Sequence, residues 1–204
     1  MYFPRPYGII RLVYPEAVFR LQTDKDEICL TFDDGPDPES TYGILELLNI
    51  HGIKAIFFCS GMKAQKYPEI IEIINSEGHQ TGNHGFHHYD GWKTATETYV
   101  RDIEKASEIV QGKNFRPPFG RIKLRQYSLL KERYSIFFWD IMPYDYDVNL
   151  SWKNSYNMLC SNLRQGSVIA LHDHQGSSCH KYLKMFITES HDKGYRFILP
   201  DIIQ

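Results

Sequence analysis

Two adjacent carboxylates near the start of the chain are the first residues suited to chemistry. The segment TFDDGP, residues 31–36, sets Asp33 and Asp34 directly before a Gly-Pro turn. Successive side chains of an extended strand point to opposite faces, so one carboxylate can bind a cation while its neighbour accepts a proton. Asp-Gly and Gly-Pro are also ordinary turn sequences, so this segment alone leaves both interpretations open.

A dense group of histidines could supply the remaining ligands of a cation site. The segment NHGFHH, residues 83–88, holds three imidazoles within five residues, and each buried ring would need partners for its nitrogens. His84 and His88 would meet on one side of a helical turn. With Asp34 they form a set of two imidazoles and one carboxylate, which suits a zinc-like cation and leaves a position open for water. His87 is then the spare histidine, exposed or behind the ligands.

Polar side chains in three later segments could complete a hydrolytic site. In the segment RPPFG, Arg116 could hold a carboxylate in a bidentate fork, while Phe119 and Gly120 could offer backbone N–H groups to an oxyanion. His172 directly follows an apolar run, and Asp145 lies in the segment WDIMPYDYD. Each also has a plain structural interpretation, as a solvated arginine on a stiff loop or as a histidine that only packs.

The elements that must position these residues follow from the hydrophobic pattern. From residue 28 onward, short apolar runs alternate with longer segments of helical period, which is the pattern of βα units around a parallel sheet. The strands are predicted at Ile28–Phe32, Ala55–Cys59, Gln80–Asn83, near Phe115, Tyr134–Ile141, Val168–Leu171 and Tyr195–Leu199. The helices are predicted at Ser40–Ile50, Tyr67–Ser76, Thr94–Val110, Ile122–Lys131, Ser151–Leu163 and Cys179–Asp192.

Every polar cluster follows the carboxyl end of a predicted strand. In parallel α/β architectures the strand-to-helix loops meet at that edge, so we expect the clusters to lie together there. Six or seven strands with intervening helices fit either a small, incomplete β/α barrel or an open doubly wound sheet. Residues 27–204 are predicted to form this single domain, and residues 1–26 an irregular arm. The arm would pack on the domain through Tyr2, Phe3, Tyr7 and Phe19.

Composition and charge exclude several classes of protein. The chain has 204 residues, of which 42% are hydrophobic, so it can bury one substantial core. Its formal net charge of -2 gives none of the basic excess that nucleic-acid binding requires. Four cysteines are too few for a disulfide scaffold. No apolar run is long enough for a signal peptide or a membrane span, so we expect a soluble, cytoplasmic monomer.

Taken together and in this order, five segments resemble the motifs of a known enzyme family. The segments TFDDGP, NHGFHH, RPPFG, WDIMPYDYD and ALHDH are similar to those of the polysaccharide deacetylases with a NodB-homology domain, carbohydrate esterase family 4. The resemblance runs from about Ile28 to the C-terminus. It implies an α/β fold with a distorted, incomplete β/α barrel. It also implies an enzyme that removes N-acetyl or O-acetyl groups from chitin oligomers, peptidoglycan, xylan or related glycans.

The resemblance implies a metal and a base at the first two segments. Asp33 corresponds to the general base of the family. Asp34, His84 and His88 correspond to the ligands of one divalent cation, for which zinc is favoured and cobalt and nickel are alternatives. The cation and the base would together activate water for attack on the acetyl carbonyl, which releases acetate and leaves a free amino sugar.

The resemblance also implies roles for residues of the later segments. Arg116 corresponds to the arginine that steadies the base. Phe119 corresponds to the aromatic residue whose backbone amide helps to bind the oxyanion, with Gly120 beside it. His172 corresponds to the catalytic histidine that protonates the leaving amine, and Asp145 to the aspartate that orients this histidine.

Three positions depart from the usual pattern of the family. Gly85 stands where the family usually has Ser or Thr, which removes a hydroxyl that braces the histidine loop. Tyr146 and Ala170 stand where it usually has Trp and Leu, two residues that shape the apolar slot for the acetyl methyl. The lining of the slot therefore changes while the reactive groups stay the same.

We therefore expect a metal-dependent deacetylase that hydrolyses the N-acetyl group of an amino-sugar-containing glycan, such as peptidoglycan or a chitin-like polymer. One alternative keeps the metal and changes the substrate to a non-sugar amide, imide or formyl group on the same fold. Another is a non-catalytic glycan-binding module. Asp33, Arg116 and His172 argue against that module, because binding alone needs neither a base nor an acid.

Overall fold

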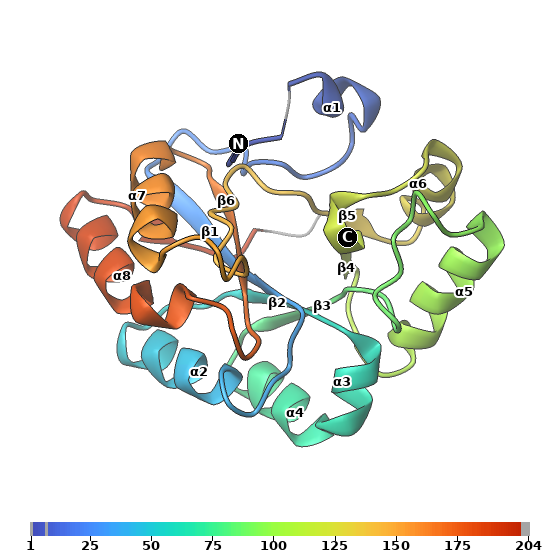
Figure 1. Ribbon diagram of the computed structural model, residues 1–204, viewed down its shortest axis with the longest axis horizontal. Coiled ribbons are helices and arrows are strands. Elements are labelled where there is room, and N and C mark those ends of the chain that lie inside the picture. The colour runs from blue at the N-terminus through green and yellow to red at the C-terminus, as the bar shows by residue number, and fades with distance from the viewer. Residues whose placement is uncertain (1, 7, 201–204) are drawn as a thin grey trace.

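A parallel sheet with helices on its outside forms the body of the protein in the computed structural model, which describes residues 2–6 and 8–200 (Figure 1). Within these residues the strands are β1 Glu27–Asp33, β2 Ile56–Cys59, β3 Gln80–Asn83, β4 Asn114–Phe115, β5 Ser135–Ile136, β6 Val168–His172 and β7 Arg196–Phe197. The α-helices are α1 Gly8–Val13, α2 Thr41–Ile50, α3 Gly61–Lys66, α4 Pro68–Ser76, α5 Thr96–Ser107, α6 Leu124–Leu130, α7 Trp152–Asn162 and α8 Leu183–Asp192. Two short 3-10 helices are η1 Pro118–Gly120 and η2 Cys179–Lys181. No helix in this part of the chain is long and apolar enough to cross a membrane.

The strands of the sheet follow the order β5-β4-β3-β2-β1-β6, with β7 also paired to β1, and every pairing is parallel. Parallel strands are covered on both faces, which explains the nearly continuous apolar runs of β1, β2 and β6. Side chains of β1 alternate between two cores. Ile28, Leu30 and Phe32 belong to the large core beneath the outer helices. The smaller cluster inside the sheet contains Cys29, Ile56, Phe58, Phe137 and Val168.

The sheet curls around this inner cluster into a half-barrel, and the helices lie around its convex side (Figure 1). The predicted incomplete β/α barrel is therefore confirmed, and the open doubly wound sheet is not what forms. The gap between β5 and β6 is crossed by two segments. The arm pairs Val18 with Phe137 and Arg20 with Ser167, and farther along the chain Ile141 pairs with β6.

The N-terminal arm differs in part from the prediction. It is not wholly irregular, because it contains the helix α1. Phe19 is buried as predicted and stacks on Phe138 with ring centroids 4.7 Å apart. Tyr2 and Phe3 are partly exposed and contact the loop that carries Tyr144, where the Tyr144 hydroxyl donates to the Phe3 carbonyl at 2.8 Å. The predicted contact of Tyr7 and the end of the predicted domain, residues 201–204, lie outside the described residues.

Most predicted elements form within a few residues of the predicted bounds, and Gln80–Asn83 forms with those bounds. The strand predicted at Tyr134–Ile141 is wrong, because only β5 joins the sheet there. The N–H of Phe137 still donates to the Phe115 carbonyl of β4, but from Phe138 onward the backbone bonds to the arm at Val18. The helix α3 was not predicted, and it ends directly before the proline that begins α4. The helix predicted at Cys179–Asp192 is divided into η2 and α8.

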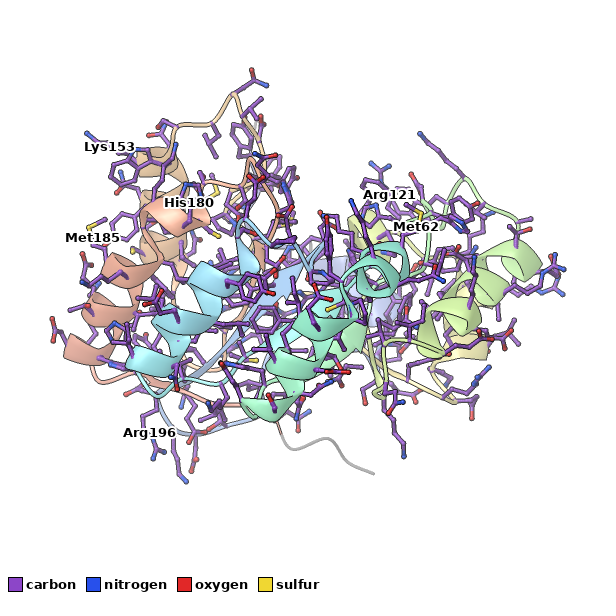
Figure 2. All side chains as sticks on the ribbon, turned by 90° about the horizontal axis from the view of Figure 1, so that it is seen from below. Met62, Arg121, Lys153, His180, Met185 and Arg196 are labelled. Carbon is purple, nitrogen blue, oxygen red and sulfur yellow. The ribbon has the colours of Figure 1, made fainter. Side chains whose placement is uncertain are left out.

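The loops that follow the strands gather at one edge of the sheet. Asp33 ends β1 and pairs in register with His172, which ends β6. Asn83 ends β3 and pairs with Phe115, so the segments that begin at His84 and Arg116 leave the sheet side by side. In Figure 2, Arg121 lies at this end of the molecule and Arg196, at the start of β7, lies toward the opposite end. The expected convergence of the polar clusters is present.

Candidate active site

A cavity of about 350 Å³ opens at the carboxyl edge of the sheet. Its lining includes eight residues singled out from the sequence: Asp33, Asp34, His84, His88, Phe119, Gly120, Tyr146 and His172. These residues come from the ends of five different strands and the connections that follow them, so only the folded sheet brings them together. Concave sites of this kind, with convergent polar groups, are where parallel α/β proteins bind and transform ligands.

Asp34, His84 and His88 present one ligand atom each to the same point. The Oδ1 atom of Asp34 lies 3.4 Å from His84 Nε2 and 3.0 Å from His88 Nε2. The three ligand atoms all lie within 4.8 Å of one another. Zinc binds imidazole and carboxylate at about 2.0–2.2 Å in tetrahedral geometry, which separates neighbouring ligand atoms by roughly 3.3 Å. The donor set therefore fits one such cation without rearrangement.

The orientation of the His84 ring is fixed from behind. Its Nδ1 atom lies 2.7 Å from the Arg116 carbonyl oxygen, so Nδ1 donates to that carbonyl and Nε2 is the atom that faces Asp34. Burial raises the pKa of Asp34, but hydrogen bonds from His84 and His88 outweigh it and hold the pKa well below its ordinary value. Asp34 is therefore a carboxylate, which is the form that binds a metal.

The two histidine ligands meet through a loop and not through a helical turn, so that part of the prediction is wrong. The chain leaves β3 at His84 and turns back within an irregular segment. Gly85 has φ 74 and His88 has φ 58, both in the left-handed region. The ring centroids of His84 and His88 are 4.9 Å apart. His87 is half-exposed, and its Nδ1 lies 2.5 Å from Asp102, away from the other two rings.

Arg116 holds the carboxylate predicted to be the base. Its guanidinium is completely buried and donates from one nitrogen, Nη1, to Asp33 Oδ1 and to Thr31 Oγ1, both at 2.6 Å. The other terminal nitrogen donates to the Phe138 carbonyl at 2.8 Å. The predicted bidentate contact is therefore wrong, because only Nη1 contacts Asp33 and Nη2 donates to a backbone carbonyl instead. The Phe58 ring supports the guanidinium from below, 4.2 Å away.

The proline-stiffened loop offers one backbone donor to the cavity, not two. Phe119 has φ 60, and no acceptor among the described residues contacts its N–H. Gly120 lines the cavity, but its N–H donates to the Pro117 carbonyl at 2.9 Å, so the prediction of a second free amide is wrong. The Phe119 ring is 57% exposed and packs edge-on against His88 at 4.6 Å.

His172, which lines the cavity, forms a buried pair with Asp145. Asp145 Oδ1 lies 2.8 Å from His172 Nδ1, and Asp145 Oδ2 accepts the His172 backbone N–H at 2.9 Å. Ser177 donates its hydroxyl to the same Oδ2 at 2.7 Å. Burial lowers the pKa of His172, but the charge and hydrogen bond of Asp145 outweigh it and raise the pKa to about 9. The ring therefore carries a proton near neutral pH and turns Nε2 toward the cavity.

The two slot positions are placed differently. Tyr146 lies edge-on to the His172 ring with centroids 4.6 Å apart and lines the cavity. Burial raises the pKa of Tyr146 to about 12, so its hydroxyl stays neutral. Ala170 is completely buried in β6 and does not line the cavity. The apolar wall is built by Trp139 and Met142 instead.

Two polar residues of the cavity were missed by the sequence analysis. Arg121 directly follows the segment RPPFG, and its guanidinium lies between the Trp92 and Phe119 rings, 5.3 and 5.8 Å from their centroids. His174 is the last residue of the segment ALHDH, and its Nε2 lies 4.0 Å from Asp34 Oδ2. Arg121 stands next to a segment that was singled out and His174 within one, so nearness to a strand-end motif was the available signal.

Comparison with known proteins agrees with this geometry. The sequence model of the polysaccharide deacetylase family matches residues 20–132, more than half of the chain. A peptidoglycan-N-acetylglucosamine deacetylase from Bacillus cereus is 35% identical over 192 residues, covering 89% of this chain and 70% of that protein. A chitooligosaccharide deacetylase from Azorhizobium caulinodans is 32% identical over 162 residues, covering 76% of this chain and 77% of that protein.

The solved structures extend the likeness to the fold. A crystal structure of a peptidoglycan N-acetylglucosamine deacetylase in complex with 4-naphthalen-1-yl-N-oxidanyl-benzamide superposes with a TM-score of 0.86 at 33% identity. The match covers 95% of this chain and 94% of that one. PdaA from Bacillus subtilis, a family 4 carbohydrate esterase, superposes with a TM-score of 0.83 at 26% identity, covering 95% of this chain and 88% of that one. The chain thus belongs to the polysaccharide deacetylases with NodB homology, carbohydrate esterase family 4, and is a hydrolase of carbon–nitrogen bonds other than peptide bonds.

Proposed function

We propose that this chain removes the N-acetyl group from an amino-sugar residue of a peptidoglycan- or chitin-like glycan, with one divalent cation held by Asp34, His84 and His88. The observation that carries the proposal is the convergence of this ligand set with two separate buried pairs around one cavity. The pairs are Asp33 with Arg116 and His172 with Asp145. Zinc is the cation that we expect, because two imidazoles and one carboxylate are its usual catalytic ligands.

Asp33 takes the role of the base. A divalent cation bound beside it polarises the substrate carbonyl and lowers the pKa of water toward about 7. Arg116 occupies Asp33 Oδ1, while Asp33 Oδ2 has no hydrogen-bond partner among the described residues. Because Asp33 lines the cavity, this second oxygen can accept the proton of the attacking water.

Two further groups act after water attacks the carbonyl carbon. One stabilises the negative charge on the oxyanion, and the other protonates the leaving amine. The unpartnered N–H of Phe119, whose φ is 60, is the donor for the forming oxyanion. On the opposite wall, His172 donates a proton to the leaving amine nitrogen as the carbon–nitrogen bond breaks. Asp145 keeps the ring in the correct orientation and favours its protonated form. Acetate and a free amino group are the products.

The rim of the cavity favours a sugar over a small non-sugar amide. The exposed rings of Phe119 and Tyr146 line the cavity, and Trp92, which is 60% exposed, contacts Arg121 of the lining. Aromatic faces with polar neighbours stack on the apolar faces of sugar rings. A module that only binds glycans would have no use for the buried pairs at Asp33 and His172.

The proposal is tested by measuring hydrolysis of each compound in a substrate panel, as release of acetate or formate or as opening of a cyclic amide. The panel contains N-acetylglucosamine oligomers, peptidoglycan fragments, acetylated xylan oligomers and formylated or cyclic amides without sugars. We expect zinc-loaded protein to release acetate from the N-acetylated glycans. Turnover confined to the sugar-free amides, or no turnover of any compound, would contradict the proposal.

A further inference from the structure

The loop between the two histidine ligands is held by a carboxylate that reaches it from α5. Asp102 is only 6% exposed. Its Oδ2 accepts the backbone N–H of Phe86 at 2.8 Å, and both of its oxygens lie 3.2 Å from the backbone N–H of His87. Its Oδ1 also lies 2.5 Å from His87 Nδ1. Phe86 and His87 are residues between His84 and His88, so Asp102 binds the middle of the ligand-bearing segment.

The opposite side of the same loop is held by the start of α3. The backbone N–H of Gly61 donates to the Gly85 carbonyl at 2.8 Å, and that of Met62 donates to the Phe86 carbonyl at 3.1 Å. The helices α3 and α5 lie side by side on the outside of the sheet (Figure 1). The loop is therefore clamped between two helices, and Asp102 supplies the only charged contact to its backbone N–H groups within the described residues.

The backbone of the loop needs this clamp. His88 has φ 58, which is unfavourable for a residue with a Cβ and persists only where the surroundings enforce it. Gly85 has φ 74, and a Cβ there would lie 3.1 Å from Asp102 Oδ2. The carboxylate thus occupies the space beside Gly85. His88 Nε2, only 3.0 Å from Asp34 Oδ1, depends on this loop conformation for its position.

We propose that Asp102 is a positioning residue for the metal site, which holds His88 at the cation through the backbone of Phe86 and His87. The inference rests on the proposed metal binding by Asp34, His84 and His88. Asp102 itself does not touch the cation or the substrate. Carboxylates that fix ligating histidines through hydrogen bonds contribute about 10–100-fold to metal affinity.

The test is a zinc titration of the full chain after removal of metal by a chelator, followed by calorimetry. Asp102→Ala removes the clamp, and Asp102→Asn keeps its shape and one acceptor oxygen. We expect the dissociation constant for zinc to rise by about 10–100-fold in Asp102→Ala and by less in Asp102→Asn. Glu104→Gln is the matched control, because this carboxylate of the same helix pairs with Arg133 on the surface and should leave zinc affinity unchanged.

A second readout separates positioning from general stability. The visible spectrum of the cobalt-loaded protein depends on the geometry of the ligands, so Asp102→Ala and Asp102→Asn should change it while Glu104→Gln does not. If Asp102→Ala does not fold, the inference is tested with Asp102→Asn. A folded Asp102→Asn protein with wild-type zinc affinity and wild-type cobalt spectrum would overturn the inference alone. A wild-type protein that binds no zinc would overturn the proposed function, and this inference with it.

Discussion

Asp33 and Asp34 are chemically identical side chains that the fold places in different surroundings. Asp33 points into the barrel interior and is held by Arg116 at 2.6 Å. Asp34 has φ 74 and turns its carboxylate toward His84 and His88. The reversal of the backbone at Asp34 separates the two groups, so one can handle a proton while the other binds a cation.

Substituting each of the two aspartates should separate their roles. General bases contribute about 10²–10⁴ in rate, so Asp33→Asn should raise the barrier by about 3–5 kcal/mol and leave the protein able to bind one zinc. Asp34→Asn should lower zinc occupancy as well as activity. Parallel measurements of kcat/KM and of bound metal check both variants. Equal metal content and equal activity in the two would show that the roles are assigned wrongly.

The pair of His172 and Asp145 makes a prediction about pH. Protonated His172 donates to the leaving amine, so kcat/KM should fall as pH rises through its pKa of about 9. Asp145→Asn removes the charge that raises this pKa and leaves the burial that lowers it. The alkaline limb should therefore move to lower pH, toward or below the ordinary histidine value of about 6.5.

A pH profile of kcat/KM for Asp145→Asn and for Asp147→Asn provides the check. Asp147 lies two residues away, is half-buried and contacts Tyr2 rather than His172, so its loss should leave the alkaline limb in place. An alkaline limb that is the same in Asp145→Asn and in the wild type would remove His172 from the role of acid.

At the scale of the elements, a buried histidine links the starts of β2 and β3. His79 is 4% exposed, and its Nδ1 accepts the Ala55 backbone N–H at 3.1 Å. Burial, together with the charge of Lys54, lowers the pKa of His79 to about 4. Below pH 6.5 the unfolded chain binds a proton here that the folded chain does not, so the contribution of His79 to stability is lost as pH falls from about 6.5 to 4.

Urea unfolding of wild type and His79→Asn at pH 7 and pH 5 measures this contribution. Asparagine keeps an acceptor for the Ala55 N–H but does not titrate in this range. We expect the wild type to lose more stability between the two pH values than His79→Asn does. An equal loss in both proteins would show that His79 titrates in the same way in the folded and unfolded chain.

The limits of prediction from sequence are clearest in the segment Tyr134–Ile141. Its apolar run is long enough for a strand, yet only Ser135 and Ile136 pair with β4. The Val18 carbonyl accepts the Phe138 N–H at 2.9 Å, and Ile141 pairs with Ile169. These partners lie far away in the sequence, and hydrophobicity does not reveal which of them will pair. The same applies to the loop between His84 and His88, which Asp102 of α5 contacts from a distant part of the sequence.

At the scale of the whole molecule, the arm is tied to the wall of the active site by a buried carboxylate. Asp140 is completely buried between Trp139 and Ile141. It is contacted by Arg5 at 3.5 Å, Arg11 at 3.2 Å and Arg164 Nε at 2.9 Å. Two of these arginines belong to the arm, so the arm, the cavity wall and the end of α7 share one ionic contact.

Asp140→Asn should destabilise the fold because it leaves three arginines gathered without a counter-charge. Removing one partner of a buried pair costs about 3–5 kcal/mol, and we expect about 3 because the arginines can reach solvent. Urea denaturation checks this value, with Asp147→Asn as control, because Asp147 contacts no arginine within the described residues. A loss no greater than that of the control would show that the network does not stabilise the fold.

The convergence of the site could be predicted from the sequence, because each motif follows a strand of a parallel sheet. Asp34, His84 and His88 therefore lie together as expected. The sequence could not show that the N–H of Gly120 is unavailable, because it donates to the Pro117 carbonyl only in the folded loop. The sequence also could not show that Ala170 is buried away from the cavity, because the curl of the sheet determines which side chains of β6 face the cavity.

The central claim is that one cation at Asp34, His84 and His88 is required for hydrolysis, and a zinc titration of activity tests it most directly. Protein freed of metal by a chelator is mixed with increasing zinc, and acetate release from an N-acetylglucosamine oligomer is measured at each step. We expect activity to be absent at the start and to reach its maximum at one equivalent of zinc, with no recovery in Asp34→Asn. Full activity of the metal-free protein would contradict the account.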